Sequence, residues 1–214
     1  MSTKRLIITS VILFGSLWGL AELGIGEMAW NADIPRAPIL TAIGILFLVL
    51  SRRIWSAPGS SFALSALAGA FKFLQHPFWG CKVAAVLMVG LIFDVALTFY
   101  EARQRSTDRD ITVGGVIAAS ALATLLSFVA FGPFARYVLS NPYWSMAGKM
   151  FDYMVAQGLI ATALAIPAAW IGLKLSERLS LSAESWTHMN WLVYRLAAAG
   201  SGIAGIAAAL ALKY

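Results

Sequence analysis

Long apolar runs separated by short polar stretches are the main pattern of this chain, and they predict helices. The runs are longer than the alternating ten-residue segments typical of a membrane β-barrel. A helix that crosses a bilayer needs roughly 20 apolar residues, and most of the runs approach or exceed that length. We therefore predict helices over residues 5–29, 39–53, 61–75, 81–101, 111–131, 151–175 and 191–212.

Proline, glycine and polar residues mark the breaks expected between these helices. Gly132 and Pro133 are predicted to close the fifth helix, because proline lacks the backbone N–H that a helix interior needs. Pro167 is predicted to kink the sixth helix. The aromatic segment 134–149 is expected to be a re-entrant or interfacial helix, and the polar segment 176–190 is expected to be a loop.

Two of the predicted helices, 39–53 and 61–75, are short for a complete span. The number of spans is therefore six or seven, and the side on which the C-terminus lies depends on that number. No internal repeat or low-complexity linker divides the chain. We predict one transmembrane domain, residues 1–214.

Composition narrows the class of protein. Hydrophobic residues make up 60% of the chain and charged residues only 12%, with a mean hydropathy of +0.78. A soluble protein has about 45–50% apolar and about 25% charged residues. An ordinary soluble enzyme and a disordered chain are excluded, and the single cysteine, Cys81, cannot form a disulfide framework. The expected fold class is all-α: a polytopic, multi-pass membrane helical bundle of six to seven spans in the lipid bilayer.

Basic residues orient the predicted spans. The net charge is +6, and a cytoplasmic N-terminus puts ten of the 16 Lys and Arg residues on the inner side and six on the outer side or outer half. Cytoplasmic loops of membrane proteins carry such an excess. We therefore predict a protein of the cell (inner) membrane with its N-terminus in the cytoplasm. The basic residues form no compact block, so nucleic acid is not an expected partner.

Three predicted outer loops each carry tryptophan beside polar groups. One interpretation is an aromatic belt, because indoles favour the headgroup region of a bilayer. The other is a lidded pocket in which aromatic rings stack on a ligand and a few polar groups orient it. The density of His, Asn and Gln beside these rings favours the pocket. Its candidate ligand-binding residues are Trp30, His76, Trp79 and Trp144.

Three ionisable residues fall inside predicted spans: Glu22, Lys72 and Asp94. A charge at mid-membrane costs about 2.5–3.5 kcal/mol on insertion scales, so such residues face the bundle interior and pair. Lys72 is expected to pair with Glu22 or Asp94. The cluster is either a structural ion pair that fixes helix register or a ligand or proton site.

The first predicted helix carries a seam of small residues around one of these charges. Gly15, Gly19, Glu22 and Gly26 share one helix face, and Trp18 flanks Glu22 at the i, i+4 spacing. Glycines allow another backbone to approach closely. The seam serves either internal packing or docking to a partner membrane protein.

Motifs for catalysis and for metal or cofactor binding are missing from the sequence. It contains no H-E-x-x-H, no G-x-S-x-G, no P-loop and no G-x-G-x-x-G. No Cys or His cluster has metal-ligand spacing. We therefore expect no enzyme activity, no metal and no cofactor.

The first helix nevertheless resembles a known group. The pattern G-x-x-W-G-x-x-E over residues 15–22, a proline at the start of the second helix, Lys72 on a small-residue third helix, and Asp94 on the fourth are similar to S components, the substrate-binding membrane subunits of energy-coupling factor transporters. The resemblance implies a bundle of about six spans that binds a vitamin-like micronutrient at an outward-facing site. It also implies docking on a transmembrane coupling protein that ATPase subunits drive.

The expected function is therefore a membrane-embedded solute-binding subunit of a micronutrient uptake transporter, with its pocket on the outer face. One alternative is a small structural or assembly subunit without a ligand, and a weaker one is an intramembrane enzyme. The expected binding site of the small-molecule solute comprises Trp18, Glu22, Trp30, Lys72, His76, Trp79, Asp94 and Trp144.

Overall fold

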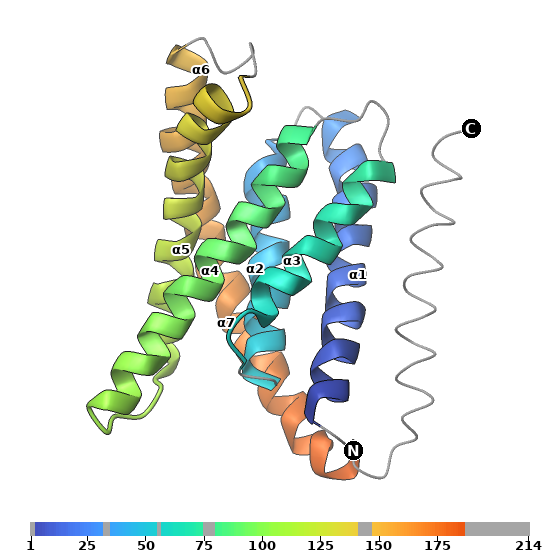
Figure 1. Ribbon diagram of the computed structural model, residues 1–214, viewed down its shortest axis with the longest axis vertical. Coiled ribbons are helices and arrows are strands. Elements are labelled where there is room, and N and C mark those ends of the chain that lie inside the picture. The colour runs from blue at the N-terminus through green and yellow to red at the C-terminus, as the bar shows by residue number, and fades with distance from the viewer. Residues whose placement is uncertain (1–2, 32–34, 55–56, 75–79, 141–146, 187–214) are drawn as a thin grey trace.

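A computed structural model describes residues 3–31, 35–54, 57–74, 80–140 and 147–186, and the regular structure within these ranges is helical (Figure 1). The elements are α1 (Thr3–Asn31), α2 (Arg36–Ile54), α3 (Ser60–Ala70), the 3₁₀ turn η1 (Phe71–Leu74), α4 (Gly80–Ser106), α5 (Val113–Pro133), the π-helical segment η2 (Phe134–Val138), α6 (Ala147–Asp152), the π-helical segment η4 (Tyr153–Gln157) and α7 (Gly158–Trp186).

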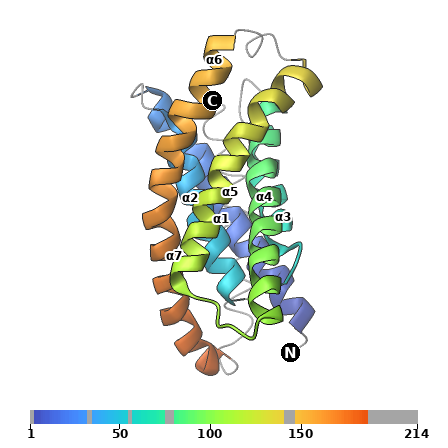
Figure 2. The ribbon, with the colours of Figure 1, turned by 90° about the vertical axis from the view of Figure 1, so that its left-hand side faces the viewer.

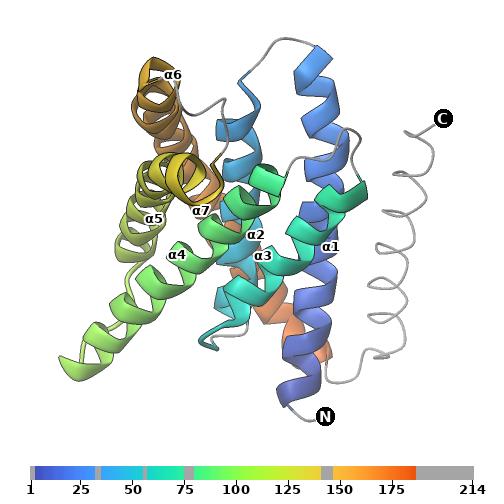
Figure 3. The same ribbon diagram turned by 45° about the horizontal axis from the view of Figure 1, so that its top comes forward.

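The long helices run up and down and form a ring. Each packs on two neighbours in the order α1, α2, α7, α5, α4, α3 and back to α1. Figures 1 and 2 show the start of α1 and the ends of α2, α4 and α7 at one end of the bundle. The end of η1 and the start of α4 lie at the opposite end, and the view in Figure 3 separates α1 and α3 from α5 on the other side of the bundle.

Four helical segments in the described part of the chain are long and apolar enough to cross a membrane. They are Arg36–Ile54, Gly80–Ser106, Val113–Val138 and Gly148–Arg178, while the apolar stretches Ser10–Ile25 and Ser60–Leu74 are shorter. The prediction of a helical membrane protein is therefore supported, but the six to seven spans are not confirmed. The predicted seventh helix, 191–212, lies outside the described residues.

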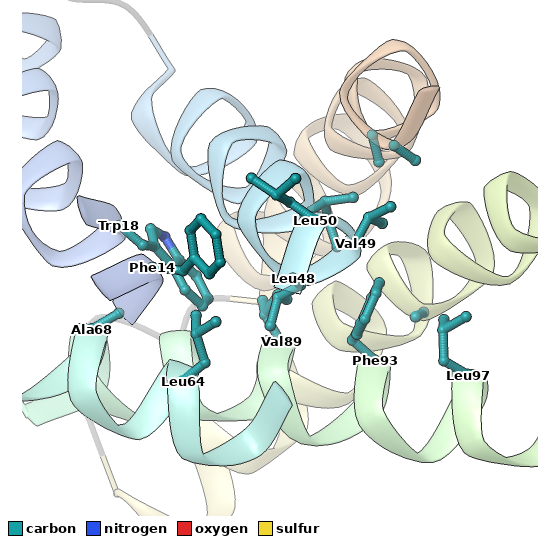
Figure 4. Close-up of a cluster of buried hydrophobic side chains, with 14 of the residues drawn as sticks. Phe14, Trp18, Leu48, Val49, Leu50, Leu64, Ala68, Val89, Phe93 and Leu97 are labelled. Atoms are coloured by element: carbon teal, nitrogen blue, oxygen red, sulfur yellow. The ribbon is translucent and has the colours of Figure 1, made fainter. Parts of the chain in front are cut away.

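The bundle has a buried apolar core and also exposes apolar side chains on its outer faces, as expected of a membrane protein. Trp18, Leu48, Leu64 and Phe93 meet in a core shared by α1, α2, α3 and α4 (Figure 4). The outer faces carry exposed apolar side chains, of which one stripe follows α4 at every fourth residue: Leu91, Val95 and Phe99. In water such a surface would favour association, whereas lipid tails accommodate it.

The break predicted at Gly132 and Pro133 is wrong. Helix α5 runs through Pro133 and continues into η2. Proline removes a backbone donor but does not force the chain to turn, and a wider π turn accommodates the interruption. The expected separate helix over 134–149 therefore begins as an extension of α5, and residues 141–146 lie outside the described ranges.

The polar loop predicted over 176–190 is also wrong for its described part, because α7 continues to Trp186. Polar residues at a helix end do not stop a helix when they can be solvated. Lys174 and Glu177 form an exposed ion pair one turn apart, with 2.9 Å between Lys174 Nζ and Glu177 Oε2. Helix α7 also runs through Pro167.

Close approach at glycines explains how α1 fits into the ring. A Cβ atom on Gly19 would lie 2.5 Å from the Phe71 ring, and one on Gly15 would lie 3.1 Å from the backbone oxygen of Leu64. Both contacts join α1 to the α3–η1 segment. This part of the glycine seam therefore serves internal packing, which confirms that interpretation for Gly15 and Gly19.

Candidate functional site

A buried ion pair joins α1 to η1. Lys72 Nζ lies 2.6 Å from Glu22 Oε2, and both side chains are almost fully buried, at 6% and 5% exposed. Lys72 Nζ also donates to the backbone oxygen of Glu22 at 3.3 Å. The predicted pairing of Lys72 with Glu22 is confirmed.

Trp18 positions the Glu22 carboxylate. Its indole Nε1 donates to Glu22 Oε1 at 3.1 Å, across one turn of α1. The indole is 1% exposed and lies against Gly44 of α2, where a Cβ atom would be 2.4 Å from the ring. With both faces enclosed, Trp18 holds Glu22 in place from within the core, and it offers no open face for stacking on a ligand.

A second buried charge cluster lies near the other end of the bundle, around Arg52 in the last turn of α2. Its guanidinium donates to both oxygens of Glu101 at 3.2 and 3.1 Å, and to Asp94 Oδ1 at 2.9 Å. It also donates to Thr98 Oγ1 at 2.8 Å and to the backbone oxygen of Ala57 at 2.7 Å. Arg52 thereby ties α2, the α2–α3 turn and α4 together.

The prediction that Asp94 shares one cluster with Lys72 is wrong. Asp94 pairs with Arg52, and its second oxygen accepts from the backbone N–H of Gly59 at 2.6 Å. Gly59 precedes α3, whereas Lys72 follows it, so the two sites are separated by about 20 Å of helix. Asp94 acts as an N-terminal anchor for α3, which suits the partial positive charge at a helix N-terminus.

Sequence reasoning missed Arg52 and Glu101, although a signal was present. Asp94, Thr98 and Glu101 follow the i, i+4, i+7 spacing and share one face of α4. A polar stripe on an otherwise apolar helix requires a buried partner. Arg52 is that partner, although its position at the end of a span is also typical of a basic residue that orients a membrane protein.

The predicted aromatic pocket falls largely outside the described residues. His76, Trp79 and Trp144 lie in undescribed segments, and the side chain of Trp30, in the last turn of α1, is also undescribed. The helix ends that flank the three predicted loops are visible. The ends of α1, η1 and η2 and the starts of α2, α4 and α6 gather at one end of the bundle (Figures 1 and 2).

An aromatic cluster joins α5 to η4. Tyr153 of η4 stacks on Phe128 with ring centroids 4.8 Å apart and meets Phe131 at 5.6 Å. Cys81 packs in the same cluster as Tyr153. Both η2 and η4 are π-helical, and such turns are frequent at functional sites.

The described residues contain no group of three or more His, Cys, Asp or Glu side chains that could hold a metal ion. Comparisons of the chain with protein-family models, with curated proteins and with solved structures find no match. The described part of the chain is all-helical, with four helices that are long and apolar enough to span a membrane and two buried charge clusters. The role of the Glu22–Lys72 site has to be argued from its own geometry.

Proposed function

We propose that this protein is a membrane-embedded solute-binding subunit of a micronutrient uptake transporter, similar to the S components of energy-coupling factor transporters. The observation that carries the proposal is the placement of the Glu22–Lys72 pair. Lys72 lies in η1, directly before the undescribed segment that carries His76 and Trp79. A buried, oriented charge pair that is close in sequence to an aromatic segment fits a polar anchor at the base of a pocket.

In this proposal Trp30, Trp79 and Trp144 supply stacking faces, and His76 supplies a hydrogen bond. A planar heterocycle held at micromolar strength needs about 8 kcal/mol. Aromatic stacks contribute about 0.5–1.5 kcal/mol each beyond the burial of area. The combined free energies of two stacks, the buried apolar area and one or two hydrogen bonds reach the value needed for micromolar binding. Trp18 positions Glu22, and Asp94 has no part in this pocket.

The transport role requires partners, because the sequence contains no ATP-binding motif. By its resemblance the protein would dock on a transmembrane coupling protein driven by ATPase subunits. Its orientation in the inner membrane would put the N-terminus in the cytoplasm. The last turns of α2 and α4 support this orientation, because they carry Arg52, Arg53, Arg103 and Arg105 at the same end of the bundle as the start of α1.

The orientation is tested at the exposed α4–α5 connection. Ser106→Cys in a Cys81→Ala background should resist a membrane-impermeant thiol reagent in intact cells and react after the membrane is opened, because Ser106 is exposed but cytoplasmic. Rapid labelling of intact cells would reverse the orientation and move the proposed pocket to the cytoplasmic side.

The pocket is tested at Trp79. Purified wild-type protein should show a ligand-induced thermal shift with at least one member of a panel of vitamins and their precursors. Trp79→Ala should lose that shift but keep expression and the melting temperature of the free protein nearly unchanged. A tryptophan of an aromatic belt behaves differently, because its loss weakens membrane anchoring and leaves any ligand response intact. The proposal fails if no compound shifts the wild type or if Trp79→Ala responds as the wild type does.

The Arg52 cluster favours a second candidate, a structural or assembly subunit without a ligand. All five N–H groups of Arg52 are used within the protein, as expected of a charge that only fixes packing. Tight co-purification with a larger membrane complex, without any small molecule, is the result that this candidate predicts.

A further inference from the structure

We draw no further inference here: the strongest candidate, the outer face of α3 on which Phe62, Ala63 and Ala70 are exposed, is an apolar helix face, and nothing in the described part of the structure shows what covers it.

Discussion

Arg52→Met should lower the free energy of unfolding by about 3–5 kcal/mol, the cost typical of removing one partner from a buried ion pair. The substitution removes the cation that pairs with both Asp94 and Glu101, and it also removes the hydrogen bond to the α2–α3 turn at Ala57. The measurement is reversible unfolding of the purified protein in mixed detergent micelles, followed by circular dichroism.

Arg53→Met is the matched control, because Arg53 is the next residue in the chain and is exposed. It should change stability by no more than about 0.5 kcal/mol. Adding D94N and E101Q to Arg52→Met should restore part of the loss, since no lone carboxylate then stays buried. Equal stability of the Arg52 and Arg53 variants would contradict the described cluster.

Lys72→Met is expected to have a comparable effect, again about 3–5 kcal/mol, because it removes the cation that lies 2.6 Å from the buried Glu22 carboxylate. The same unfolding assay measures it. Lys174→Met is the control, since its ion pair with Glu177 is about half exposed and such pairs contribute only about 0–1 kcal/mol.

Second-site changes distinguish the two clusters. Adding E22Q to Lys72→Met should recover part of the lost stability, because Glu22 is the carboxylate that contacts Lys72. Adding D94N should recover none and should lower stability further, because Asp94 belongs to Arg52 and Gly59. Rescue by D94N would instead support the prediction from sequence that Glu22, Lys72 and Asp94 form a single cluster.

The sequence predicted the helices well because a membrane span requires a continuous apolar run, and this requirement depends little on the rest of the fold. The short second and third helices appeared at nearly their predicted positions. The Lys72–Glu22 pair could also be predicted, since a buried charge needs a partner and few were available. The glycine seam of α1 indicated close packing, but the sequence left open which helix would approach it.

The predictions from sequence that proved wrong were those that depended on which helices pack against each other. Asp94 could have paired with either cation until the positions of Gly59 and Lys72 at opposite ends of α3 were known. Gly132 and Pro133 suggested an end to α5, but packing against η4 favours continuation through a π turn. Local residue preferences cannot decide such cases, because tertiary contacts provide more stability than the local preference removes.

Native mass spectrometry of the protein, purified from membranes in mild detergent, tests solute binding most directly. We expect the 23.0 kDa chain with one small molecule bound at a 1:1 ratio, and loss of that molecule from Trp79→Ala prepared in the same way. A wild-type chain that carries no small molecule, while remaining associated with a larger membrane complex, would contradict solute binding and favour a structural subunit.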